Sequence, residues 1–80
     1  MQTDPHIVHI KIDGGGIYLN QIKVVDMASL LASLKEEAEA VPQPLIKVHT
    51  NPSSAFVLGE VLFQTQVAEF PETSIEVLWD

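Results

Sequence analysis

The sequence predicts an α+β fold: a two-layer sandwich in the order ββαβαβ, in which a mixed sheet carries two helices on one face. Short segments in which apolar and polar residues alternate are typical of half-buried strands. Two longer stretches with apolar residues at three- and four-residue spacing are typical of amphipathic helices. Each helix connects strands that would run parallel, and such crossovers are right-handed, so both helices are expected on the same face of the sheet.

The first two predicted strands form a hairpin around a cluster of glycines. Apolar and polar residues alternate over Ile7–Ile12, and Ile17–Leu19 returns as the second strand. Gly14–Gly16 supply the positive φ angles that a tight turn requires. A phosphate-binding loop would need a helix directly after the glycines, so we interpret the cluster as a turn. Residues 1–6 are expected to be a flexible lead-in to a single domain at residues 7–80.

The first predicted helix follows a short extended segment, Ile22–Val24. Asp26 is suited to cap this helix, because an aspartate side chain accepts hydrogen bonds from the first free N–H groups. Proline cannot continue a helix, so the pair Pro42 and Pro44 ends it. Alternation resumes in the third predicted strand, Leu45–Thr50. The predicted buried stripe of the helix consists of Met27, Leu30, Leu31, Leu34, Ala38 and Val41.

The second predicted helix, Ala55–Ala68, is apolar over most of its circumference. Asn51 or a serine after it is expected to cap this helix. A helix of this kind needs cover on more than one side, either from the sheet and the first helix or from another chain. The predicted buried face is formed by Leu58, Val61, Leu62 and Thr65. The residues expected to meet another chain are Phe56, Phe63, Val67 and Phe70.

The last predicted strand is Ser74–Asp80, in which Ile75, Val77 and Trp79 alternate with polar residues. A turn at Phe70-Pro71 precedes it. Trp79 is expected to close one end of the core, because a tryptophan ring buries a large apolar area.

Composition narrows the classes of partner and chemistry. Eleven acidic residues stand against four lysines, with no arginine and a formal net charge of −7. Nucleic acid is therefore not an expected partner, because phosphate contacts require clustered cations. Cysteine is absent, so neither disulfides nor thiolate metal sites are expected. No motif indicates a cofactor, and none is expected.

The reactive side chains predict a non-catalytic protein. The serines lie outside a nucleophile elbow. Glu36, Glu37 and Glu39 are neighbours on a helix surface, without the apolar pocket that general-acid catalysis would require. His9 and His49 are weak metal-ligand candidates, because they lie on strands that could be neighbours and could share a face. The more ordinary interpretation is that both are solvent-facing strand residues.

The stretch Val8–Asn20, followed by Val24, Asp26 and the leucine-rich helix, resembles the periplasmic domain of the ExbD/TolR family of biopolymer-transport proteins. In that family a strand runs through a glycine-bearing turn into a second strand that ends in Asn. A segment carrying a Val, a helix, a strand, a second helix and a last strand follow. The likeness covers Ile7–Trp79, and its marker positions are Tyr18, Asn20, Val24 and Asn51.

The chain departs from the family pattern at three points. Thr50-Asn51 stands where the family has Ala-Asp, and Phe70-Pro71 replaces a glycine before the last strand. The membrane helix of the family, which carries its proton-conducting Asp, has no counterpart in these residues. No proton-pathway residue is therefore carried over.

The resemblance implies a homodimeric periplasmic domain that takes part in energy transduction driven by the proton-motive force. It implies an ExbB/TolQ-like channel and a TonB/TolA-like transducer as partners, and attachment to the membrane through an N-terminal anchor outside this chain. The alternative is a freestanding small cytoplasmic domain with a regulatory or ligand-sensing role. The two differ in whether a transmembrane helix is encoded upstream.

Overall fold

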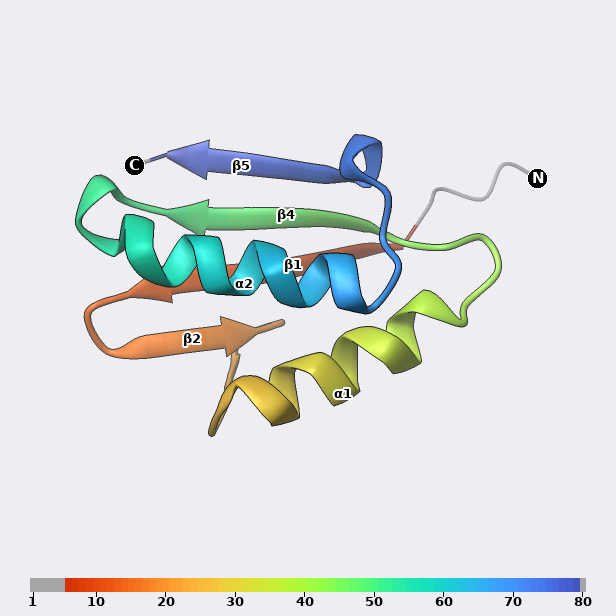
Figure 1. Ribbon diagram of the computed structural model, residues 1–80, viewed down its shortest axis with the longest axis horizontal. Helices are drawn as coiled ribbons and strands as arrows, with labels where there is room; N and C mark the ends of the chain where they lie inside the picture. The colour runs from red at the N-terminus through yellow and green to blue at the C-terminus, as the bar shows by residue number, and fades with distance from the viewer. Residues whose placement is uncertain (1–5, 80) are drawn as a thin grey trace.

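The computed structural model of the protein describes residues 6–79, so the expected lead-in lies outside the described residues except for His6. Figure 1 shows a sheet with two helices on one of its faces, which confirms the predicted two-layer α+β fold. The strands are β1 (Ile7–Asp13), β2 (Gly16–Leu19), β3 (Ile22–Lys23), β4 (Leu45–Thr50) and β5 (Ile75–Trp79). The helices are α1 (Met27–Ala38) and α2 (Ala55–Val67), with two short 3₁₀ helices, η1 (Pro52–Ser54) and η2 (Glu72–Ser74).

The sheet is mixed, as the sequence predicts, and β1 lies at its centre. The strand order is β3-β2-β1-β4-β5. β1 pairs antiparallel with β2 through the hairpin, and parallel with β4 through the crossover that contains α1. β4 pairs parallel with β5 through the crossover that contains α2. The extended segment predicted before α1 forms β3, a two-residue edge strand.

The core lies between the helices and the central strands. Along β1 the alternation places Val8, Ile10 and Ile12 on the helix-facing side, where each is at most 2% exposed. Leu30 and Leu34 of α1 are fully buried against them. The remaining buried members of this core cluster are Ile46, Val48, Leu58, Val61, Ala68 and Phe70. Burial of one large aliphatic or aromatic side chain contributes about 1.5–3 kcal/mol, so this cluster supplies most of the driving force for folding.

The two hairpin turns require residues with positive φ. In the β1–β2 turn, Asp13 Oδ1 accepts a hydrogen bond from the N–H of Gly15 at 2.8 Å, and Gly16 has a φ of 135°. A side chain at Gly16 would be strained in that conformation. The β2–β3 turn uses Asn20 and Gln21, with φ of 49° and 73°. Positive φ at both central residues is characteristic of the type I′ turns that close many two-residue hairpins, and asparagine tolerates it well.

Phe70 was predicted to lie on an interaction surface, but the structure buries its side chain. The residue is only 4% exposed and belongs to the core. The reason is the way α2 ends: Glu69 has a φ of 69°, its N–H donates to Gln66 O at 3.0 Å, and the N–H of Phe70 donates to Thr65 O at 3.0 Å. These two bonds form a Schellman motif, which reverses the chain after the helix. Phe70 is thereby turned inward.

Three smaller expectations also differ from the structure. Val41 is 96% exposed, because α1 ends at Ala38 and the predicted stripe does not continue beyond it. Trp79 is 55% exposed on the edge strand β5, so it does not close the core. Neither Asn51 before η1 nor Ser54 before α2 makes a side-chain capping bond.

The predicted cap of α1 is confirmed, and it makes the helix sensitive to acid. Asp26 Oδ1 accepts a hydrogen bond from the N–H of Ser29 at 2.8 Å, and chiefly this bond lowers the pKa of Asp26 below its usual value of 3.8. Because the pKa is lower in the folded than in the unfolded state, the stabilisation is present above the unfolded value. It is lost as the pH falls through the folded value.

We therefore expect Asp26→Ala to lower the melting temperature at neutral pH by several degrees, because the Ser29 N–H loses its partner. The difference from wild type should begin to shrink as the pH falls below about 3.8, and it should disappear only below the lower pKa of the folded protein, where the carboxylate that accepts the bond becomes protonated. Thermal unfolding followed by circular dichroism across a pH series measures this. Asp26→Asn retains a capping side chain and serves as the control. A difference that stays constant with pH would contradict the assignment.

Candidate functional site

The sheet face opposite the helices carries a row of polar side chains whose positions follow from the strand register. Lys11 on β1 lies opposite Tyr18 on β2 and opposite His49 on β4. One step along, His9 on β1 lies opposite Lys47 on β4. Residues that lie directly opposite each other project from the same face of a sheet. These five residues therefore share one surface, called the open sheet face below.

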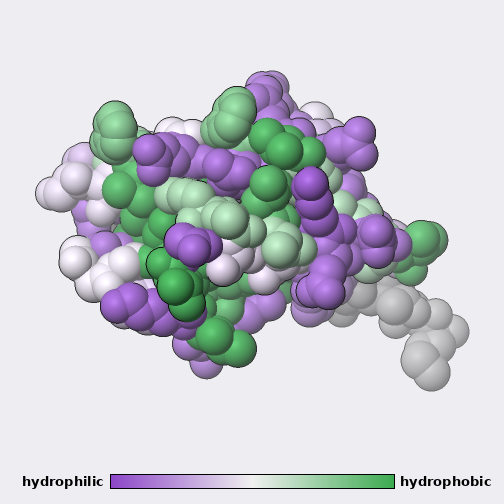
Figure 2. All heavy atoms as spheres, turned by 60° about the horizontal axis from the view of Figure 1, so that its bottom comes forward, coloured by the Kyte–Doolittle hydropathy of each residue, from purple (hydrophilic) through white to green (hydrophobic). Residues whose placement is uncertain are grey.

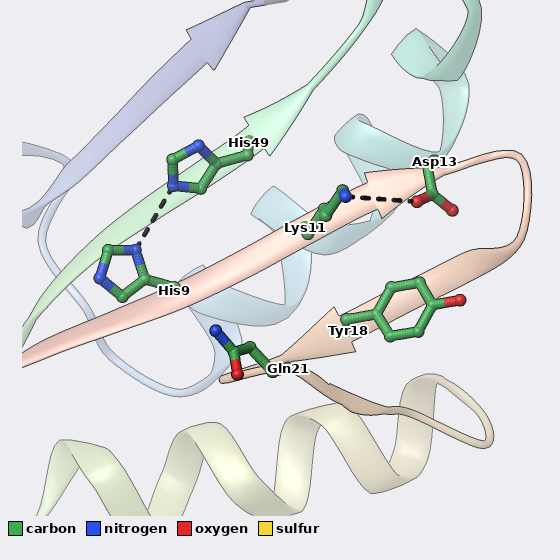
Figure 3. Close-up of a pocket in the computed structure, with 6 residues that line it drawn as sticks. All are labelled: His9, Lys11, Asp13, Tyr18, Gln21 and His49. Atoms are coloured by element: carbon green, nitrogen blue, oxygen red, sulfur yellow. Dashed lines mark hydrogen bonds and ion pairs between the residues drawn. The ribbon is translucent and has the colours of Figure 1, made fainter.

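His9 and His49 are in contact on this face, as Figure 3 shows. His9 Nδ1 lies 3.4 Å from His49 Nε2. The two rings stack with centroids 5.6 Å apart and an angle of 27° between their planes. The sequence-based expectation that the two histidines could share a face is thus confirmed, because β1 and β4 are neighbours.

The marker residue Asn20 holds the backbone of β1 at His9. Asn20 Oδ1 accepts a hydrogen bond from the N–H of His9 at 3.0 Å, and the N–H of Asn20 donates to His9 O at 2.8 Å. Asn20 therefore forms hydrogen bonds with both the N–H and the C=O group of His9. No local sequence signal reveals this role, because the two residues are 11 positions apart.

The open sheet face carries more lysines than carboxylates, and most of these lysines lie close to a carboxylate. Lys11 Nζ lies 3.9 Å from Asp13 Oδ2, and Lys47 Nζ lies 3.9 Å from Glu76 Oε1. Lys23 on β3 lies opposite Tyr18 and adds a third lysine to the face. Three of the four lysines of the chain are thus gathered here. Many acidic residues lie instead on the helices and loops: Asp26, Glu36, Glu37, Glu39, Glu60, Glu69 and Glu72.

A hollow of about 700 Å³ lies over this part of the sheet. Figure 3 shows the residues that line it, drawn from β1, β2, β4 and the turn after β2. They are His9, Lys11, Asp13, Tyr18, Gln21 and His49. Imidazole, ammonium, carboxylate, phenol and amide groups can all donate or accept hydrogen bonds there, so the hollow suits a polar ligand.

A second candidate surface lies on the helix side of the molecule. Of the residues predicted to meet another chain, Phe56, Phe63 and Val67 are 81%, 59% and 41% exposed. Figure 2, in which the α1 side comes forward, shows apolar side chains reaching the surface between polar ones on this side. The buried face predicted for α2 is present at Leu58, Val61 and Thr65, while Leu62 is half-buried.

A groove of about 510 Å³ separates α2 from β5. Phe63 and Leu62 of α2 line one wall, and Ile75 and Val77 of β5 line the other. β5 is the last strand of the sheet, so no other described strand pairs with its outer edge. Figure 1 shows that α2 lies over β1 and β4 and leaves β5 at the margin of the helix layer. Unpaired backbone groups and an apolar groove therefore lie side by side.

The remaining marker positions differ in how deeply they are buried. Tyr18 lies on the open sheet face and Val24 is half-buried against the core. Asn51 Oδ1 is buried and has no hydrogen-bond partner among residues 6–79.

Within residues 6–79, no group of three or more His, Cys, Asp or Glu residues is arranged to hold a metal ion. No helix in the described part of the chain is long and apolar enough to cross a membrane.

Comparisons of the chain with models of protein families, with curated proteins and with solved structures found no match.

Proposed function

We propose that this chain is a non-catalytic protein-interaction domain that self-associates and binds an extended segment of a partner at the edge of β5. The observation that carries the proposal is the position of the unpaired β5 edge beside the groove between α2 and β5. An exposed strand edge offers main-chain hydrogen bonds to an added strand, and pockets beside it select alternate side chains.

The register indicates how an added strand would fit. Ile75, Val77 and Trp79 are the residues of β5 on the helix-facing side, because they pair with Ile46, Val48 and Thr50 of the buried face of β4. Alternate side chains of a strand laid along β5 would project to the same side. They would enter the groove and contact Phe63, and the partner strand would cover Trp79.

The wider context that we propose is energy transduction of the ExbD/TolR kind. In this context the domain is periplasmic, a TonB/TolA-like transducer supplies the extended segment and an ExbB/TolQ-like channel lies beside it. Two things support this: the likeness over Ile7–Trp79, and an element order that agrees with the one this likeness implies. Asn20, the most specific marker of the likeness, has a defined structural role in joining β2 to β1.

Nuclear magnetic resonance and sedimentation velocity test this proposal together. A concentration series of the wild-type domain is expected to show dimers, with amide shifts at Ile75–Trp79 and in α2. Phe63→Lys should weaken this association at least tenfold, because it places a charge in the apolar groove. Ala32→Lys introduces the same charge at an exposed position of α1 and serves as the control. A soluble segment of a TonB- or TolA-like protein is expected to shift the same β5 amides.

Two results would contradict the proposal. The first is a wild-type protein that stays monomeric at high concentration and does not respond to the transducer segments. The second is equal weakening of association by Phe63→Lys and Ala32→Lys, which would reflect charge alone.

The hollow on the open sheet face favours a second candidate, a freestanding cytoplasmic ligand-sensing or regulatory domain. The same spectra separate the two functions. A ligand-sensing domain would show its largest shifts at the hollow, in β1, β2 and β4, when small polar metabolites are added. An interaction domain would show its largest shifts at β5, when it self-associates or when the transducer segment is added.

A further inference from the structure

We propose that His9 and His49 form a two-imidazole site for a divalent transition-metal ion, zinc being the ion tested, on the open sheet face. This inference is independent of the proposed function, because it concerns the face of the sheet opposite the groove. It rests on the separation of two nitrogen atoms, on the charges around them and on the backbone that holds them.

The separation of the two nitrogens is the one that a tetrahedral ion requires. Zinc binds histidine nitrogen at about 2.0–2.1 Å with tetrahedral angles, which places two ligand nitrogens about 3.3–3.4 Å apart. His9 Nδ1 and His49 Nε2 are 3.4 Å apart. As a hydrogen bond the same contact is poor, because N–H donors in proteins usually lie about 2.9–3.0 Å from their acceptors. An ion placed between the rings would replace a weak contact with two coordinate bonds.

The neighbouring lysines do not leave the site strongly positive. Lys47 lies opposite His9, and Lys11 lies opposite His49. Each lysine has a carboxylate partner at 3.9 Å, Glu76 and Asp13 respectively. The four charges sum to zero, so a divalent cation does not meet a net repulsion from them.

The strands hold the backbone of both histidines in position before an ion arrives. β1 and β4 are paired over Ile7–Lys11 and Leu45–His49, so both histidines lie on paired segments. Asn20 fixes both main-chain groups of His9 on its other side. Backbone that is already fixed by strand pairing loses little conformational entropy when an ion binds, which increases affinity.

The donor set defines the class of ion. Imidazole nitrogen suits zinc, copper and nickel, whereas magnesium and calcium prefer oxygen ligands. Because residues 6–79 provide no group of three such ligands, the ion would keep open positions. These positions would take water or an anionic oxygen donor, such as a carboxylate. The site is therefore of the open kind, unlike the closed four-ligand sites that stabilise zinc-dependent folds.

Zinc titration of the wild-type domain tests the proposal, with calorimetry for affinity and the imidazole nuclear magnetic resonance signals for location. One zinc ion is expected to bind per chain, with shifts at the rings of His9 and His49. His9→Gln and His49→Gln should each weaken binding on the order of 100-fold, because one tethered ligand then acts alone. Both positions are on the polar face of the sheet, so the variants are expected to fold, which circular dichroism checks.

His6→Gln is the matched control, because His6 lies apart from the pair, with its Nε2 3.6 Å from Glu37 Oε2. It should leave the zinc affinity unchanged, and magnesium should produce no shift at either ring. Copper(II) should give an electron paramagnetic resonance spectrum with two nitrogen ligands in the wild type and one in His49→Gln. Equal losses of affinity in all three histidine variants, or no binding by the folded wild type in millimolar zinc, would overturn the proposal.

Discussion

Ile10→Ala is expected to lower the free energy of unfolding by about 2–5 kcal/mol. Ile10 is fully buried on the central strand β1, where it belongs to the cluster formed by the sheet and both helices. Truncation removes its transfer free energy and leaves a cavity that a tightly packed sheet cannot close. For a chain of 80 residues the total stability is on the order of 4–12 kcal/mol, so this substitution removes a large part of it.

Urea unfolding followed by tryptophan fluorescence and circular dichroism measures the change. Ile22→Ala is the control: the residue type is the same, but Ile22 is 73% exposed on the edge strand β3. Its effect should stay within about 0.5 kcal/mol, as for other surface substitutions. Similar losses for the two variants would show that the sheet is not packed as described.

Phe70→Ala should destabilise the protein by about 3–5 kcal/mol. The side chain is 4% exposed and follows the Schellman motif, so it packs in the core and also secures the end of α2. The same denaturant titration measures the loss of stability.

Phe56→Ala is the matched control, because it removes an aromatic ring of the same size from the surface of the protein. Phe56 is 81% exposed at the start of α2, so its truncation should leave stability almost unchanged. If Phe56→Ala were the more destabilising of the two, the inward turn after Glu69 would be incorrect. The pair thus separates an aromatic residue of the core from one on the surface.

Local patterns were sufficient to predict most of the fold. The alternation of Val8, Ile10 and Ile12 identified the buried side of β1, and the Asp26 cap fixed the start of α1. The alternation of apolar and polar residues gave the other strands, while the crossover rule placed both helices on one face. These features depend on near neighbours in the sequence, where steric and hydrogen-bonding preferences act directly.

The features that the sequence did not predict depend on chain reversals and on strand pairing between residues far apart in the sequence. Phe70 extends the apolar side of α2 on a helical projection, but the helix has already ended and Glu69 reverses the chain. A glycine at that position would have indicated the motif, and a glutamate does not. Trp79 was assigned to the core because of its size, whereas the strand order leaves it on the edge.

The candidate sites were only partly predictable for the same reason. Strand alternation placed His9 and His49 on the polar sides of their strands, but their contact depends on β1 and β4 being neighbours in a particular register. The support of His9 by Asn20 follows from the β1–β2 pairing. Phe56, Phe63 and Val67 were recognised from the pattern of apolar residues around the helix, but the groove beside β5 required the sheet order.

The uneven placement of charge described for the open sheet face gives the molecule a permanent electric dipole. Lys11, Lys23 and Lys47 lie on that face, whereas acidic residues crowd the helices and loops of a chain with a net charge of −7. In the field of another charged molecule such a domain rotates before it makes contact. An anionic surface would meet the sheet first and a cationic one the helices, and added salt would remove this preference.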